Sequence, residues 1–135
     1  MAAAPKSRIE SYRDLIVWQK GMDLAASIYE CTARFPNFEQ YGLSSQMRRA
    51  AVSVPANIAE GFGRATGRDY ANFLSIARGS VLEVETMVLL SERLRYINEE
   101  TCRGLVLSTQ EVARMLYSLR RRVTARGEPI SPAED

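Results

Sequence analysis

The chain has 135 residues and no histidine. It therefore lacks the side chain that most often acts as a general base near neutral pH, binds zinc or iron, and stands in the middle of a Ser-His-Asp triad. A ferritin-type di-iron centre is excluded as well, because it needs Glu-x-x-His pairs on facing helices. The sequence predicts a protein that is not an enzyme, with no catalytic residues, no metal site and no cofactor.

Cysteine is nearly absent: Cys31 and Cys102 are the two present, and they form no CxxC pair. Both lie in stretches of helical periodicity, where a cysteine packs as a small apolar residue, so we expect two reduced thiols. The chain also has no apolar run near the roughly 18 residues that span a bilayer, and its start, MAAAPKSR, lacks the apolar stretch of a secretory signal. We expect a cytoplasmic protein with no membrane partner.

Lysine is rare too, because sixteen of the eighteen basic residues are arginine. A guanidinium group suits paired hydrogen bonds to a carboxylate or a phosphate. Residues 9–127 contain 16 basic and 13 acidic side chains. This positive excess is mild, well short of a histone-like charge.

Apolar residues recur at helical spacing in four segments, and no segment alternates convincingly with the period of a strand. The segments span about residues 14–35, 39–60, 66–97 and 98–127, with short polar or Gly/Pro breaks between them. Short connections favour antiparallel neighbours, so we predict an all-α, antiparallel up-down-up-down four-helix bundle over residues 9–127. Residues 1–8 and 128–135 are predicted to be disordered tails.

The first helix is predicted to begin with Asp14 as N-cap and to carry two apolar seams. The main seam is Leu15, Trp18, Met22, Ala25, Tyr29 and Thr32, and the second is Val17, Gly21, Leu24, Ile28, Cys31 and Phe35. Trp18 is expected to pack in the core or in an interface, and Gly21 permits a close approach of a neighbouring helix.

The second helix contains Pro55, which removes one backbone hydrogen bond and crowds the carbonyl of Ala51. We predict a kink there, although a new helix that starts at Ser53 is an open alternative. Gly61 and Gly63 are expected to end the helix.

Thr66 and Asp69 form a variant of the capping box for the third helix, and Asn98 is predicted to cap the fourth. The third helix is apolar nearly all round, which burial against another subunit would explain. The fourth has one inner seam: Leu105, Thr109, Val112, Leu116, Leu119 and Val123. Gly127 and Pro129 are expected to stop it.

Polar residues lie beside the apolar face of the second helix, where a purely structural helix would not need them. The stripe consists of Gln46, Arg49, Ser53, Asn57, Glu60 and Arg64, and the third helix offers Ser80 and Glu83 at matching positions. Solvated surface is one interpretation. We favour a polar network of Gln46, Arg49, Ser53, Asn57, Glu60, Ser80 and Glu83 that fixes register within the bundle or between subunits.

Arginines cluster near the end of the fourth helix, where no acid follows Glu111 until Glu128. Solvation at the helix C-terminus and phosphate binding are both open interpretations. The candidate phosphate contacts are Arg48, Arg49, Arg114, Arg120, Arg121 and Arg122. A second anion site, in the GFGRATG run from Gly61 to Gly67, has little support because no strand precedes it.

Three blocks of the chain, YRDLIVWQKGMDLA, FPNFEQYGLSSQMRRAAVSVPANIAEGFGR and YANFLSIARGSVLEVETMVLLSERLRYI, resemble one family. It is the four-helix-bundle family encoded in intervening sequences of bacterial 23S rRNA genes. The resemblance covers about residues 12–97 and implies a cytoplasmic homo-oligomer, a ring-like pentamer, with no established enzymatic activity. The family is similar to the accessory bundle protein of diversity-generating retroelements, which is more basic and is linked to nucleic acid and a reverse transcriptase.

These observations leave three hypotheses of different classes. The first is an oligomeric accessory protein that binds RNA or DNA through arginines and works with a ribonucleoprotein or a reverse transcriptase. The second is a scaffold that binds another protein through apolar surface on the first and third helices. The third is a histidine-free hydrolase that uses Glu60 and Glu83 as paired carboxylates.

Overall fold

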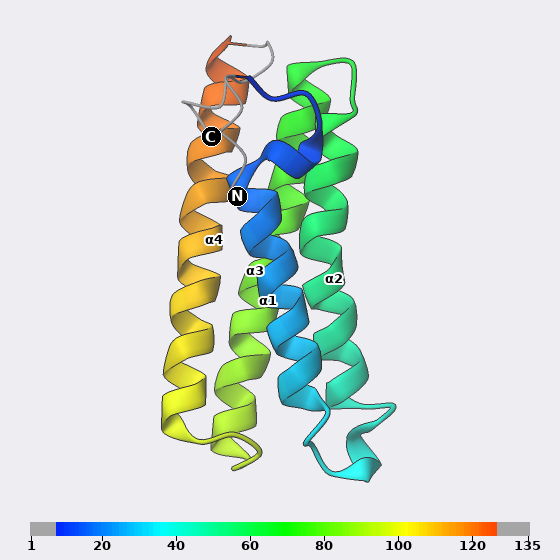
Figure 1. Cartoon of the computed structure of the whole chain (residues 1–135), viewed down its shortest axis with the longest axis vertical. Coiled ribbons are helices and arrows are strands. Elements are labelled where there is room, and N and C mark those ends of the chain that lie inside the picture. The colour runs from blue at the N-terminus through cyan, green and yellow to red at the C-terminus, as the bar shows by residue number, and fades with distance from the viewer. Residues whose placement is uncertain (1–7, 127–135) are drawn as a thin grey trace, which may run out of the picture.

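The computed structural model describes residues 8–126, which contain helices and no strand (Figure 1). The elements in chain order are η1 (Tyr12–Asp14), α1 (Ile16–Thr32), η2 (Asn37–Glu39), α2 (Leu43–Phe62), α3 (Gly67–Arg93) and α4 (Glu99–Arg126), where η denotes a short 3₁₀ helix. The predicted tails, apart from Arg8, and the predicted stop at Gly127 and Pro129 lie outside the described residues.

The four α-helices lie side by side and alternate in direction, as Figure 1 shows. α1 packs on α2, α2 on α3, α3 on α4, and α4 closes the bundle against α1. The predicted all-α, up-down-up-down arrangement is confirmed. Because of the alternation, the N-terminal half of α3 lies beside the C-terminal half of α4, at the upper end in Figure 1.

Two clusters of buried side chains fill the interior, one toward each end of the bundle. The first includes Val17, Val54, Ile58, Leu74, Leu116 and Leu119, and the second includes Leu24, Ile28, Met47, Val88 and Leu105. Every residue of the predicted inner seam of α4 is buried. Burial of these side chains supplies the main driving force for assembly of the bundle.

The first predicted seam of α1 is buried in part, at Leu15, Ala25 and Thr32. Val17, Gly21, Leu24 and Ile28 of the second seam are buried, whereas Met22 and Tyr29 of the supposed main seam are nearly half exposed. The second seam, which was expected to widen the apolar face, therefore contributes more residues to the core than the first. Trp18 is partly buried and packs on the core, as expected.

The predicted N-cap of α1 was wrong by one residue, and the predicted end of α3 was wrong by four residues. Asp14 does not cap α1, because its carboxylate accepts the backbone N–H of Ser11 at 3.0 Å and so belongs to η1. α3 stops at Arg93 instead of Ile97, because Arg95 adopts a left-handed backbone (φ 64°) and the N–H of Tyr96 bonds the carbonyl of Ser91 at 2.9 Å. This pattern is a Schellman ending, in which glycine is the usual residue.

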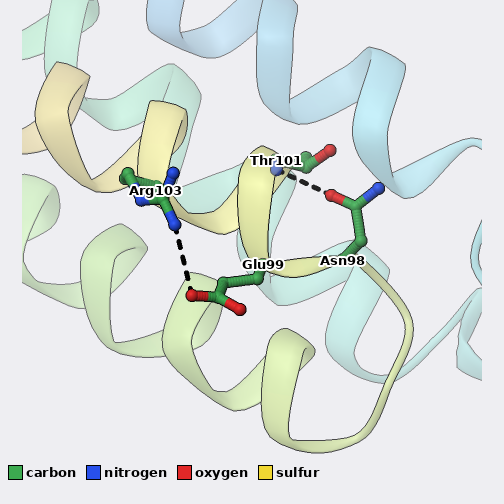
Figure 2. A network of polar contacts seen from close by, with 4 residues as sticks. All are labelled: Asn98, Glu99, Thr101 and Arg103. Atoms are coloured by element: carbon green, nitrogen blue, oxygen red, sulfur yellow. Dashed lines mark hydrogen bonds and ion pairs between the residues drawn. The ribbon is translucent and has the colours of Figure 1, made fainter.

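Two predicted caps are confirmed. The hydroxyl of Thr66 accepts the N–H of Asp69 at 3.1 Å at the start of α3. Figure 2 shows the start of α4, where the side-chain oxygen of Asn98 accepts the N–H of Thr101 at 2.7 Å. One turn further on, Arg103 pairs with Glu99 at 3.2 Å on the exposed surface, a contact that adds little stability.

Helix α2 runs through Pro55 without interruption, so the alternative of a new helix at Ser53 is wrong. The kink expected there stays a prediction. α1 approaches this part of α2 closely at Gly21, where an added Cβ would lie 3.4 Å from Val54 and 3.7 Å from Pro55. Because these distances are ordinary van der Waals contacts, the expected role of Gly21 in permitting a close approach stays a prediction.

Gly63 caps the C-terminus of α2, as predicted, whereas Gly61 lies buried within the last turn of the helix. A Cβ at this position would lie 2.8 Å from the Cβ of Phe73 and 3.1 Å from the ring of Tyr70. Both neighbours belong to α3, and the Cβ of Phe73 is fixed to the backbone. Only glycine therefore lets α2 and α3 meet at this distance.

We expect Gly61→Ala to lower the free energy of unfolding by about 1–3 kcal/mol, because the two helices must separate to admit the methyl group. Gly79→Ala is the matched control, since no atom lies within 4 Å of its added Cβ. That change should stabilise the protein by up to about 1 kcal/mol. Urea unfolding of both variants measures the difference, and equal stability of Gly61→Ala and wild type would contradict the close approach.

Glu39 links the segment between α1 and α2 to the turn between α3 and α4, at the lower end of the bundle in Figure 1. One carboxylate oxygen accepts the N–H of Leu43 at 3.0 Å and so caps α2, while the other accepts the hydroxyl of Tyr96 at 2.8 Å. The ring of Tyr96 also packs against Phe35, with 5.1 Å between centroids. The segment before α2 is thus fixed to the turn between α3 and α4.

The hydrogen bond to Glu39, together with burial and the Glu39 charge, raises the pKa of Tyr96 above its usual value near 10. Because the folded-state pKa is the higher one, this stabilisation is complete below about pH 10 and is lost as the pH rises through the raised pKa. We expect an absorbance titration of the native protein to show one tyrosine ionising late. The Tyr96→Phe variant should lack that late step; an unchanged titration would contradict the assignment.

Candidate nucleic-acid interface

Three of the six arginines predicted to contact phosphate lie on one face. Arg114, Arg120 and Arg121 are exposed on α4, and Arg114 and Arg120 line hollows between α4 and α3. Arg122 is half-buried, and its Nε has no hydrogen-bond partner among the described residues. Successive residues point in different directions on a helix. Arg120 therefore lines the hollow toward α3, whereas Arg121 lines a separate hollow with Arg122 and also lies near the ring of Tyr117.

The two arginines of α2 lie apart from this face. Arg48 is half-buried against α1, where its Nε donates to the hydroxyl of Thr32 at 2.8 Å and its guanidinium lies 5.1 Å from the ring centre of Tyr29. Arg49 is exposed and makes no hydrogen bond or ion pair with any described residue. The structure therefore does not bring Arg48 and Arg49 together with the arginines of α4.

Helix α3 supplies two further arginines that the sequence analysis did not include. Arg68, with Asn72, faces Arg120 and Thr124 across one hollow. Arg78, with Leu82, faces Arg114 and Tyr117 across a second hollow, nearer the middle of the bundle. We call this surface the basic groove and define it by Arg68, Arg78, Arg114, Arg120 and Arg121 around Tyr117.

Tyr117 is the aromatic residue of the basic groove, and its side chain is 52% exposed. The guanidinium of Arg78 lies 5.7 Å from the ring centre, and that of Arg121 lies 6.0 Å from it. These distances are at the outer limit of a cation–π contact. The two arginines thus gather near the ring without tight packing on it.

Two acids, Asp69 in the first hollow and Glu85 in the second, line the hollows beside four arginines. α3 has no acid between Asp69 and Glu83, and α4 has none after Glu111. Glu85, at the edge of the groove, accepts the hydroxyl of Thr109 at 3.1 Å. None of the five groove arginines forms an ion pair within the part of the chain that the structure describes. Their charges are therefore available to an external anion.

The predicted polar network is present in part, between α2 and α3. The hydroxyls of Ser53 and Ser80 lie 2.9 Å apart, and the side-chain amide of Asn57 donates to the Ser53 hydroxyl at 2.9 Å and to its carbonyl at 2.8 Å. Glu60 instead pairs with Arg64, one turn along the same helix, at 2.8 Å. The side chains of Gln46, Arg49 and Glu83 make no such contact with described residues.

We expect Asn57→Ala to lower the free energy of unfolding by about 1 kcal/mol, because it removes part-buried hydrogen bonds to Ser53. Glu60→Ala serves as the control and should cost less than about 0.5 kcal/mol, since its pair with Arg64 is exposed. Thermal unfolding of both variants measures the difference. An equal loss in the two variants would show that the network is not centred on Ser53.

The neighbouring surface of α3 keeps apolar side chains in solvent. Ile76, Leu90 and Leu94 are each more than two-fifths exposed, and they follow the same stripe as Ser80 and Glu83. Leu82 and Leu89 are similarly exposed on the side toward α4. The excess of apolar residues predicted from the sequence is thus not absorbed within one chain.

The cysteines and the other potential metal-binding side chains form no cluster of three within the described residues. Cys31 and Cys102 are free, as predicted, and burial is the main cause that raises the pKa of each thiol. Within residues 8–126, no three potential metal-binding side chains of the His, Cys, Asp or Glu type come together. No described helix has the length and apolar character needed to cross a bilayer.

Comparison with known proteins agrees with this architecture. A crystal structure at 1.70 Å of a protein of unknown function from the S23 ribosomal protein family of Bacteroides thetaiotaomicron superposes with a TM-score of 0.71. It is 26% identical over 78% of this chain and 99% of that one. No curated protein matches the sequence. The model of the 23S rRNA-intervening sequence protein family matches residues 13–118, and the chain belongs to that family.

Proposed function

We propose that this protein is a cytoplasmic, homo-oligomeric and non-enzymatic accessory of an RNA or a ribonucleoprotein. It binds the nucleic-acid backbone through the basic groove. The single observation that carries the proposal is the convergence of four arginines of α3 and α4 on two hollows, with Arg121 beside Tyr117, and none of the five has an ion-pair partner among the described residues. Such a surface attracts phosphates and releases their counterions on binding.

We expect the affinity of the groove for nucleic acid to depend little on base sequence. Arginines at its rim reach phosphates, which fix position but carry no sequence information. The mild charge excess of the whole chain does not oppose this function, because the five arginines concentrate the positive charge on one face. Arg48 and Arg49 are left out of the proposed contact set because they lie on α2, away from the groove. Arg122 is left out because it is half-buried, although it lines a hollow with Arg121.

Self-association is the second part of the proposal. The exposed Ile76, Leu90 and Leu94 would become buried if the α2/α3 face met another copy of the chain. A ring of five copies, which the family resemblance implies, would also repeat the basic groove around the assembly and strengthen binding by multivalency. Native mass spectrometry tests this part. A pentamer is the expected mass, and a monomer at micromolar concentration would contradict it.

A salt titration of binding to structured RNA and to DNA tests the nucleic-acid part. The logarithm of the affinity should fall linearly with the logarithm of the salt concentration, as counterion release requires. Binding that does not depend on salt, or no binding at low ionic strength, would remove this function.

A protein scaffold is the second candidate, and one observation favours it. Phe38 and Tyr41, in the connection before α2, are 70% and 90% exposed although both are aromatic. Exposed aromatics of this kind are common in protein interfaces. A reverse transcriptase or another protein partner that stays bound after nuclease treatment would favour this candidate over direct nucleic-acid binding.

A further inference from the structure

The basic groove combines two kinds of hollow, and the difference between them indicates which form of nucleic acid fits. The polar residues that line the hollow at the upper end of the bundle are Arg68, Asn72, Arg120 and Thr124, together with one acid, Asp69. Its guanidinium, amide and hydroxyl groups are those that bind a phosphate. The second hollow adds an aromatic ring, Tyr117, and an aliphatic side chain, Leu82, that phosphate binding does not require.

The second hollow has the chemistry of a base-binding site. The ring of Tyr117 is 52% exposed and Leu82 is 43% exposed, so a flat apolar surface faces solvent between charged neighbours. Gln110 and Arg114 line the same hollow and bring an amide and a guanidinium to its edge. A stacked base presents this same combination of an apolar face and a polar edge.

The spacing of the two hollows agrees with one nucleotide step. Arg120 lies three residues beyond Tyr117 on α4, which corresponds to about 4.5 Å along the helix axis. A base on Tyr117 therefore leaves the adjoining phosphate within reach of Arg120. In a duplex the bases are paired and stacked on one another, so no base face is free to meet the ring.

We propose that the basic groove selects single-stranded nucleic acid, with one unpaired base stacked on Tyr117 and the neighbouring phosphate held by Arg68 and Arg120. This inference rests on the proposed function and names its ligand class. Arg78 and Arg121, 5.7 and 6.0 Å from the ring centre, move aside or pack on the base as it enters. The selection comes from stacking and does not depend on the identity of the base.

The test measures binding of the full chain to a 20-nucleotide single-stranded RNA and to a blunt duplex of the same sequence. Three variants separate the contributions: Tyr117→Leu removes the ring and keeps an apolar side chain, Tyr117→Phe keeps the ring, and Tyr41→Leu removes an exposed tyrosine far from the groove. Circular dichroism of each variant confirms folding before the binding assay.

We expect wild type to bind the single strand more tightly than the duplex. Tyr117→Leu should weaken single-strand binding by about 5- to 150-fold and leave duplex binding unchanged. Tyr117→Phe and Tyr41→Leu should behave as wild type. Equal binding of both RNAs with no effect of Tyr117→Leu would overturn the inference and leave the proposed function intact, whereas no binding of either RNA would overturn both.

Discussion

Replacing Arg114, Arg120 and Arg121 together by glutamine is expected to weaken binding to single-stranded RNA by about 10²-fold at about 50 mM salt. The reason is counterion release, since each phosphate contact contributes a slope of about −0.7 to the salt dependence of the affinity on a single strand. Loss of three contacts should therefore make the slope less steep by about 2. Fluorescence anisotropy with a labelled RNA, repeated over a series of salt concentrations, measures both quantities.

The control for this variant removes the same charge from other places. Arg13, Arg34 and Arg49 are exposed and lie on η1, after α1 and on α2. Their triple replacement by glutamine lowers the net charge by the same three units. If binding depended on net charge alone, the two triple variants would lose affinity equally, and the basic groove would have no special role. We expect the control to retain most of the affinity and nearly the whole salt slope.

Leu116→Ala should lower the free energy of unfolding by about 2–5 kcal/mol. Leu116 is fully buried on α4, where it packs in the same core cluster as Ile58 and Leu74. Truncation removes apolar burial and leaves a cavity that the surrounding helices fill only in part. Chemical denaturation monitored by circular dichroism gives the change, with the same protein concentration for every variant because of the proposed oligomer.

Leu107→Ala is the matched control on the same helix. Leu107 is 61% exposed, so its truncation should change the stability of a single chain by less than about 0.5 kcal/mol. A loss as large as that of Leu116→Ala would contradict the description of this side chain as solvent-exposed. It would indicate instead that Leu107 is buried against another copy in the oligomer.

The sequence predicted the fold well because the helical spacing of apolar residues directly indicates which side of each helix faces the core. The inner seam of α4 and the caps at Thr66 and Asn98 depend on residues within one helix, and all of them are confirmed. The sequence predictions failed at positions whose burial or role depends on contacts with a second helix. Gly61 is read in the sequence as a helix end, although its real neighbour is Phe73 on α3. Met22 and Tyr29 look like core residues until the position of α2 is known.

The candidate site was predicted only in part for the same reason. A cluster of arginines is visible in the sequence near the end of the fourth helix, but Arg68 and Arg78 lie more than thirty residues earlier. Only the antiparallel packing of α3 on α4 brings them to one groove. The sequence also could not show that Arg48 is held by Thr32 and Tyr29 on α1. A pattern of charges along the sequence therefore identifies a binding surface only when the fold is known.

Photo-crosslinking of the native protein to a uridine-rich single-stranded RNA, followed by peptide mapping, tests the central claim most directly. The basic groove predicts crosslinks in residues 68–82 of α3 and 110–121 of α4, with Tyr117 among the modified residues. Crosslinks confined to α1 and the exposed face of α2, or no crosslink under conditions of measurable binding, would contradict the assignment of the groove as the nucleic-acid interface.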